Sequence, residues 1–133
     1  MMSRLSTIDA SLLEAIDEVL ENVFGENGRN IIVQTLRKKN FMKWNEVPKR
    51  PKVLADTLKA MFESSSIIVE DLILENFYSK LNLNYKWKKS YRFSDYINEV
   101  KYERINEQFE RKRLQEAEES LRNLKNTRKR SKH

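Results

Sequence analysis

Residues 67–81, IIVEDLILENFYSKL, decide the fold of this chain. Their apolar side chains fall nearly all the way round a helix of 3.6 residues per turn, which is typical of a helix buried on every side. Three consecutive serines at 64–66 separate this segment from the one before it. The sequence therefore predicts a central helix around which the other elements pack.

Three amphipathic segments precede this helix. The first covers residues 6–25, with the spacing of a capping box at its start and apolar residues at helical intervals. The second covers 31–39, although the β-branched residues 31–33 also suit a short strand. The third covers 51–62 and starts with proline, a favourable first helical residue. Together the four segments predict a compact domain of two helical hairpins.

The two hairpins show a weak internal similarity at an offset of 38 residues. This offset places Leu20 on Leu58 and Phe24 on Phe62, while Gly25, in the expected turn at 25–28, falls on Glu63. Two interpretations stay open. The similarity reflects either a stacked pair of related hairpins or chance agreement between amphipathic helices, since two copies are few for a repeat.

A long helix is predicted after the domain. Ser94 is a good N-cap, and nothing interrupts a helix from about residue 95 to 126. Leu114, Leu121 and Leu124 form a narrow stripe along it, which indicates either a solvated helix or a surface that pairs with a partner. The expected organisation is a bundle at 1–93, the long helix at 94–126 and a disordered basic tail at 127–133.

The composition indicates an all-α protein that is stabilised by apolar packing. The chain of 133 residues has two glycines, two prolines and no cysteine, so tight turns are few and disulfides are excluded. No apolar run approaches the length of a membrane span, and the first residues lack the apolar core of a signal peptide. We expect a cytoplasmic protein that neither crosses nor binds a membrane.

Catalysis is not expected. The one histidine is His133, at the C-terminal end, so a histidine-based triad or metal site has no scaffold. Glycine-rich phosphate loops and nucleophile elbows are also missing. Carboxylates cluster at residues 70–75 and 116–119, where the simplest interpretation is a solvated helix face. The sequence predicts neither an enzyme, nor a cofactor, nor a metal site, nor a small-molecule substrate.

Positive charge is concentrated in three blocks. Residues 37–60 carry a net charge of +6, residues 81–92 carry +4 and residues 122–133 carry +6. The first two blocks hold both tryptophans, Trp44 and Trp87. Cations attract phosphates and aromatic faces stack on exposed bases, so this combination is typical of proteins that bind RNA or single-stranded DNA. The alternative is that Phe41, Trp44 and Trp87 cover the ends of the core, while the lysines only solvate the connectors.

The first functional hypothesis is a non-catalytic nucleic-acid or ribonucleoprotein accessory factor. The second is a regulatory adaptor that binds a protein partner through the acidic face of the first helix or through Leu114, Leu121 and Leu124. The first hypothesis expects the two basic connectors to converge on one face. Its contact residues are Lys38, Lys39, Lys43, Trp44, Lys49, Arg50, Lys86, Trp87, Lys88, Lys89 and Arg92 in the connectors, and Arg128, Lys129, Arg130 and Lys132 in the tail.

Residues 12–101 also carry a family resemblance. It depends on the segments 24–28, 47–51, 60–62, 72–81 and 93–97, which are mostly core and turn positions. In these segments the chain resembles a family of small helical archaeal domains of unknown function that occur alone or as output modules of signalling proteins, such as Nitrosopumilus output domain five. The resemblance implies an archaeal source and a helical fold, and it implies no catalytic residue. The tail after residue 105 lies outside it.

Overall fold

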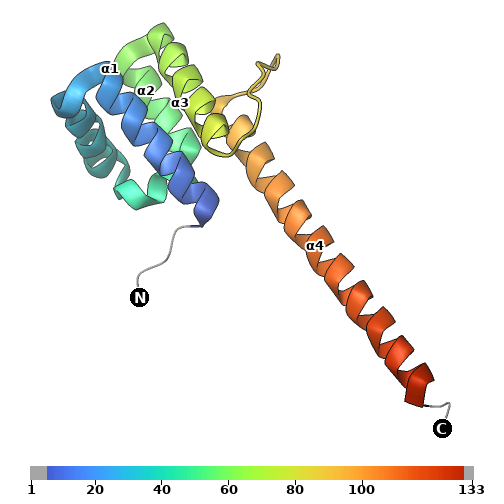
Figure 1. The fold of residues 1–133 in the computed structure, drawn as a ribbon. Helices are drawn as coiled ribbons and strands as arrows, with labels where there is room; N and C mark the ends of the chain where they lie inside the picture. The colour runs from blue at the N-terminus through green and yellow to red at the C-terminus, as the bar shows by residue number, and fades with distance from the viewer. Residues whose placement is uncertain (1–5, 131–133) are drawn as a thin grey trace. The chain divides into compact units, whose positions relative to one another are not determined.

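A computed structural model describes residues 6–130 of the chain, with side chains to residue 125 (Figure 1). Its α-helices are α1 (Thr7–Asn40), α2 (Pro51–Phe62), α3 (Ser66–Lys80) and α4 (Phe93–Arg130), with short 3₁₀ helices at Trp44–Lys49 and Glu63–Ser65. Every regular element in the described part is a helix, so the all-α prediction is confirmed. The chain divides into two compact units, Met1–Asn98 and Glu99–His133. No helix at residues 6–130 is long and apolar enough to cross a membrane.

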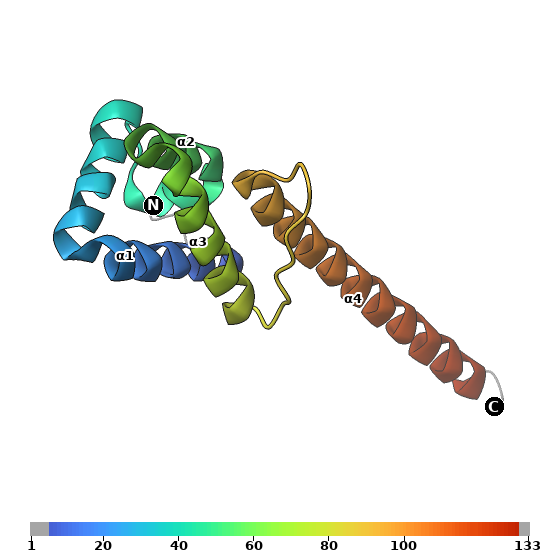
Figure 2. The ribbon, with the colours of Figure 1, turned by 90° about the horizontal axis from the view of Figure 1, so that it is seen from above.

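Helix α1 begins as predicted and then bends sharply in its middle. The Ser6 hydroxyl accepts the Asp9 N–H at 3.1 Å, which caps the first turn. Gly25, with φ 74° and ψ 175°, adopts a conformation that essentially only glycine tolerates, and two arms meet there (Figure 2). Gly25 alone makes the bend, so the turn that we predicted over residues 25–28 is longer than the observed one. The second arm starts directly after Gly25, and the strand alternative for 31–33 is wrong.

A second bend occurs at Glu63, 38 residues after Gly25. Glu63 follows α2 with φ 54°, in the left-handed region that Gly25 also occupies. Phe24 and Phe62, the residues before the two bends, stack with ring centroids 4.5 Å apart and planes 10° from parallel. Each of the two segments therefore has a backbone bend, and the phenylalanine before one bend packs against the phenylalanine before the other. Glu63 adopts this conformation at a steric cost that a glycine would avoid.

The core of the first unit lies between α1, α2, α3 and the start of α4. Met42 and Val47 from the connector before α2 are also buried in it, so this connector is part of the packed structure. The helical side chains that are almost fully buried are Leu12, Ile16, Leu20, Ile32, Leu36, Leu54, Leu58, Ile73, Phe77 and Ile97. This apolar packing supports a fold that needs no disulfide.

Helix α3 is less buried than its sequence suggests. One face packs inward through Val69, Ile73 and Phe77. The opposite face leaves Ile67 at 66% and Ile68 at 65% of their full exposure. The expectation of a helix buried on every side is therefore wrong. In this small unit other elements pack against only one side of α3. The helix is apolar all round, so part of its apolar surface stays exposed to water.

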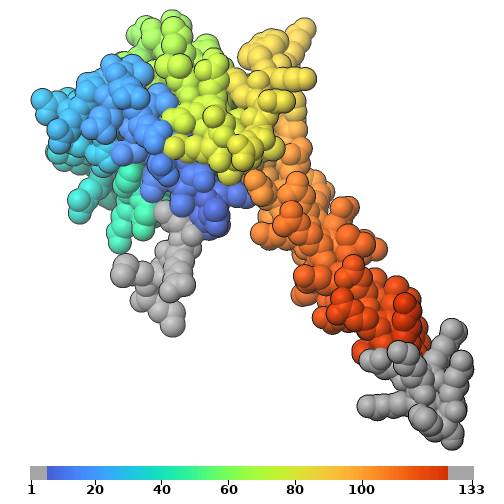
Figure 3. Space-filling view, in the orientation of Figure 1, coloured from blue at the N-terminus to red at the C-terminus, as the bar shows by residue number. Residues whose placement is uncertain are grey.

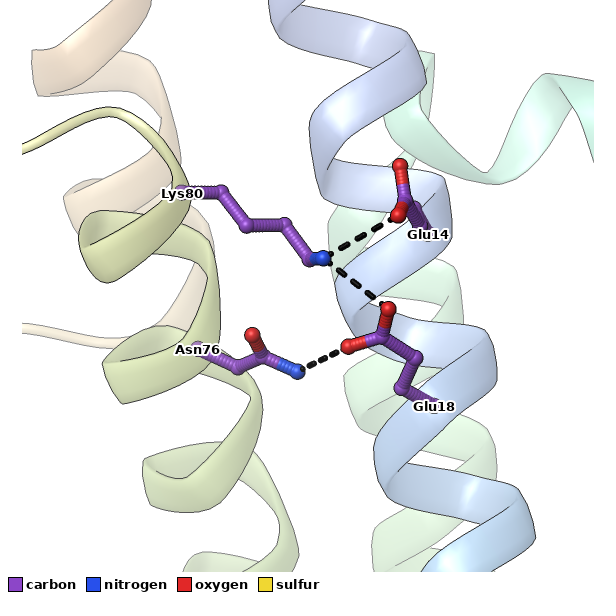
Figure 4. A network of polar contacts seen from close by, with 4 residues as sticks. All are labelled: Glu14, Glu18, Asn76 and Lys80. Atoms are coloured by element: carbon purple, nitrogen blue, oxygen red, sulfur yellow. Dashed lines mark hydrogen bonds and ion pairs between the residues drawn. The ribbon is translucent and has the colours of Figure 1, made fainter.

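A polar network joins α1 to α3 at the surface (Figure 4). The Lys80 ammonium lies 2.9 Å from Glu18 Oε1 and 3.2 Å from Glu14 Oε1, and the Asn76 amide donates to Glu18 Oε2 at 2.8 Å. The hydrogen bonds from Asn76 and Lys80 lower the pKa of Glu18. The bond to Glu18 raises the pKa of Lys80. The network sets the register of two helices that are far apart in sequence.

Helix α4 begins and ends at other residues than predicted. It starts at Phe93, because the Asp95 carboxylate accepts the Arg92 N–H at 2.8 Å and caps the turn, so the N-cap expected at Ser94 is wrong. The helix continues to Arg130. Residues 127–130 of the predicted disordered tail are therefore helical, as suits cations at a helix C-terminus, and residues 131–133 lie outside the described part. The first unit also ends at Asn98 instead of residue 93.

Candidate functional site

The second basic connector leaves α3 through a well-defined helix end. Asn82 adopts a left-handed φ of 57° and donates its N–H to the Ser79 carbonyl at 3.1 Å. The Leu83 N–H bonds to the Tyr78 carbonyl at 2.9 Å. This pair of bonds is a Schellman motif, and asparagine tolerates its left-handed position better than most residues. The chain is thus directed away from the helix axis into residues 85–92, which we call the aromatic loop.

Four tyrosines hold the aromatic loop against the unit. The rings of Tyr78 and Tyr85, of Tyr85 and Tyr96, and of Tyr96 and Tyr91 meet edge to face, with centroids 5.0–5.3 Å apart. Such pairs each contribute about 0.5–1.5 kcal/mol beyond the area that they bury. The series joins α3 and α4 to both ends of the loop, and it therefore restricts the loop to one conformation.

Hydrogen bonds from two of these tyrosines fix the loop backbone. The Tyr96 hydroxyl accepts the Lys88 N–H at 2.7 Å and donates to the Lys88 carbonyl at 3.2 Å. The Tyr85 hydroxyl donates to Asp71 at 2.8 Å. Burial, together with the neighbouring Asp71 carboxylate, raises the pKa of Tyr85, so this hydroxyl stays protonated and keeps donating. The middle of the loop is thus anchored to α4 and its start to α3.

The aromatic loop presents an exposed Trp87 among cations. Its indole is 73% exposed, which is unusual for so large an apolar side chain. Lys86, Lys88, Lys89 and Arg92 are exposed around it, and the Lys88 ammonium lies 4.9 Å from the centre of the Tyr91 ring. In the space-filling view the loop, in gold, stands at the surface (Figure 3). The loop can therefore offer one aromatic face and several positive charges to a ligand.

A groove with a volume of about 840 Å³ lies between α2, α3 and the aromatic loop. Trp87, Tyr91 and Arg92 line it from the loop, with Ile67 and Leu74 from α3. Its other charged side chains are the cations Lys52 and Lys59 and the carboxylates Asp56, Glu63, Glu70 and Asp71. Burial raises the pKa of Glu70. The four carboxylates outnumber the three cations of the lining, so the groove itself disfavours phosphates.

The first basic connector has a different structure. Trp44 is half-buried, and the Arg29 guanidinium lies 5.3 Å from the centre of its ring. Arg29 also forms an ion pair with Asp17, so the contact links both arms of α1. Trp44 therefore has an intramolecular cation on one face, and its partial burial is in line with the core-lid interpretation. Phe41, at 88% exposure, and Trp87 do not fit that interpretation.

The groove brings together few of the predicted contact residues. Of these it includes Trp87 and Arg92, and the first basic block adds Lys52 and Lys59 to it. The other members of the first connector are exposed residues at the end of α1 and beside the following 3₁₀ helix, namely Lys38, Lys39, Lys43, Lys49 and Arg50, and they do not line it. Arg128, Lys129 and Arg130 belong to the α4 backbone, while Lys132 lies outside the described residues. The structure thus brings only Lys52 and Lys59 of the first block to the groove beside the loop.

Sequence reasoning missed two parts of the site. Lys59 lines the groove although it had no predicted role, and the spacing of Lys52, Asp56, Lys59 and Glu63 along one face of α2 is a signal that could have identified it. The anchoring role of Tyr96 depends on its place beside Lys88 in the fold, which the sequence does not show. On α4, the predicted stripe residues Leu114, Leu121 and Leu124 are all exposed.

Comparison with protein-family models, with curated proteins and with solved structures finds no match to this chain. The resemblance to small helical archaeal output domains therefore stays a prediction. What can be inferred about function depends on the geometry of the aromatic loop and of α4.

Proposed function

We propose that the protein is a non-catalytic accessory factor that binds RNA or single-stranded DNA through the aromatic loop. The observation that carries this proposal is the exposure of Trp87 within a run of exposed cations on a loop that internal hydrogen bonds hold in place. An exposed indole loses hydration on stacking against a base, and a loop that is already ordered gives up little conformational entropy when it binds.

Each exposed side chain of the aromatic loop suits a different part of a nucleic acid. Lys86 and Lys89 are exposed on the loop and suit contacts with the phosphate backbone, which carry affinity but no sequence information. Trp87 suits stacking, which accepts every base. The carboxylates of the groove repel phosphates, whereas Lys86 and Lys89 do not line the groove and are open to them. The proposal therefore predicts a binding mode with weak sequence preference and a strong dependence on salt.

The test is fluorescence anisotropy of a labelled single-stranded RNA, titrated with the full chain over a range of salt concentrations. We expect the logarithm of the association constant to fall linearly with the logarithm of the salt concentration. Replacing both Lys86 and Lys89 by Gln should flatten that slope by up to about 1.4, because each phosphate that a lysine neutralises adds about 0.7 to it. The matched control replaces Arg104 and Arg111 by Gln, which removes the same charge from the second unit.

Trp87→Ala tests the aromatic part separately. Removing the stack on one base should weaken binding by about 1–3 kcal/mol, or about 5- to 150-fold, and leave the salt slope unchanged. Trp87→Phe should restore part of the affinity, because phenylalanine also stacks. An intact chain that binds no RNA or single-stranded DNA at low salt would exclude the proposal.

The second candidate is an adaptor that binds a protein partner. The observation that favours it is the exposure of Leu114, Leu121 and Leu124 on one helix. A pull-down with and without nuclease separates the two candidates. Partners bridged by nucleic acid are released by nuclease treatment, whereas a protein held directly by α4 is retained.

A further inference from the structure

The second unit carries a long apolar stripe that no part of the described structure covers. From Ile105 to Lys125 every side chain is exposed. Six large apolar side chains of α4 keep between 50% and 67% of their full exposure. They are Tyr102, Ile105, Phe109, Leu114, Leu121 and Leu124. Exposed apolar residues so closely spaced along one helix indicate an interaction surface.

Five of these six side chains, all but Leu114, lie on one face of α4 together with Arg113 and Ala117. Beginning at Tyr102, successive positions of the stripe are separated by three, four, four, four, four and three residues and end at Leu124. This corresponds to about 3.7 residues per turn, which is close enough to the helical period for the stripe to follow the helix axis. The intermediate positions are Ile105, Phe109, Arg113, Ala117 and Leu121.

The order of spacings is the same when it is read from either end, with Arg113 in the centre. An antiparallel copy of the helix, related by a two-fold axis at Arg113, therefore places Tyr102 opposite Leu124 and Ile105 opposite Leu121. A two-fold interface requires this kind of self-complementarity, because the same surface must fit itself. An unrelated partner would not require a symmetric stripe.

The charges favour the antiparallel direction. Residues 122–130 contain five cations and no carboxylate, so a parallel pair would bring ten positive charges together. An antiparallel pair instead brings Lys125 beside Glu103 of the other copy. At the centre, Glu110 and Glu116 lie about one turn before and after Arg113, so four carboxylates surround the two guanidinium groups.

We propose that the stripe of α4 pairs two copies of this chain as an antiparallel helix pair centred on Arg113. This surface is separate from the aromatic loop, and its pairing does not depend on nucleic-acid binding. The pair extends over residues 102–124, or about 33 Å at 1.5 Å per residue. The dimer carries two aromatic loops.

Because the natural chain has no cysteine, single introduced cysteines report the arrangement without interference. Arg113→Cys should form a disulfide-linked dimer under mild oxidation, since the two-fold axis passes between the two positions. Leu124→Cys alone should stay unlinked, since its two copies are about 33 Å apart. A mixture of Leu124→Cys with Tyr102→Cys should form a linked heterodimer. Linking of Leu124→Cys to itself, or no linking at Arg113→Cys, would overturn the proposal.

Light scattering of the unmodified chain provides the second readout. The chain has a mass of 16.0 kDa, so the dimer should have about twice that mass and dissociate on dilution. Changing both Ile105 and Leu121 to Glu should yield a monomer whose circular dichroism is still helical. The matched control changes Gln108 and Gln115 to Glu, which adds the same charge on the other side of α4 and should leave the dimer intact. A monomeric natural chain at every concentration, or a dimer that survives the Ile105 and Leu121 changes, contradicts the pairing.

Discussion

Tyr96→Phe tests whether the aromatic loop is held in place by a single hydroxyl. The ring of Tyr96 is almost fully buried, and its hydroxyl forms two hydrogen bonds with the Lys88 backbone, at 2.7 and 3.2 Å. The substitution keeps the ring, and thus its contacts with Tyr85 and Tyr91, and removes only these two bonds. Two bonds contribute about 1–3 kcal/mol in total. Since Lys88 is exposed, its backbone groups can bond to water instead, so we expect a destabilisation near 1 kcal/mol.

For the unit Met1–Asn98, a destabilisation of about 1 kcal/mol lowers the melting temperature by about 4–8 °C. The second measurement is amide hydrogen exchange at Lys88, which should become faster because its N–H no longer has its acceptor. The control is Tyr102→Phe, the same change in the second unit, which keeps the ring in the α4 stripe and should alter neither quantity. If Tyr96→Phe melts like the natural chain and Lys88 exchanges at an unchanged rate, the loop is not anchored by this hydroxyl.

Three further predictions concern the first unit. Phe77→Ala empties a fully buried position and should cost about 3–5 kcal/mol, measured by urea denaturation; a cost below 1 kcal/mol would mean that the core is loosely packed. Gly25→Ala should cost about 1–3 kcal/mol through its backbone alone, since no atom lies within 4 Å of the added methyl group, and an unchanged urea midpoint would contradict the bend. Glu18→Gln should cost less than about 1 kcal/mol at pH 7, because the bridge is largely exposed to solvent. As the pKa of Glu18 is lowered on folding, its contribution is present above the ordinary value of 4.5 and is lost as the pH falls through the folded value. The difference between the two proteins should therefore shrink as the pH falls below 4.5, and a difference that stays constant over the acid range would exclude this origin.

The helices could be predicted because apolar periodicity determines them. The bend at Gly25 could be predicted from the residue type, since glycine alone readily adopts its backbone angles. The bend at Glu63 was not predicted, because glutamate has no local preference for a left-handed φ. Its conformation accompanies the stacking of Phe62 on Phe24, a contact between residues far apart in sequence. Tertiary contacts of this kind are not contained in a local pattern.

Burial was harder to predict than helix position. The periodicity of α3 indicates apolar residues all round, but it does not show how many neighbouring elements exist to cover them. Ile67 and Ile68 are exposed because α1 and α2 cover only one side. The start of α4 was misplaced for a similar reason. A serine at position 94 suits an N-cap, yet the Asp95 carboxylate accepts the Arg92 N–H, and the helix begins two residues earlier than expected.

The composition of the aromatic loop was evident from the sequence, but the contrast between the two tryptophans was not. Trp44 and Trp87 both lie among lysines. Only the fold brings Arg29 over Trp44, and only the tyrosine series holds Trp87 at the surface. The predicted tail is also shorter than expected, because its first residues continue α4.

The difference between these two tryptophans provides the most direct test of nucleic-acid binding. Trp44→Phe leaves Trp87 as the only indole, and Trp87→Phe leaves only Trp44. Both variants are titrated with single-stranded RNA at low salt, and tryptophan emission is followed. We expect strong quenching in Trp44→Phe, because an exposed Trp87 stacks on a base, and little change in Trp87→Phe, because Trp44 is half-buried under Arg29. Unchanged emission of Trp87 at RNA concentrations that saturate binding, or no binding at all, would contradict the proposed role of the aromatic loop.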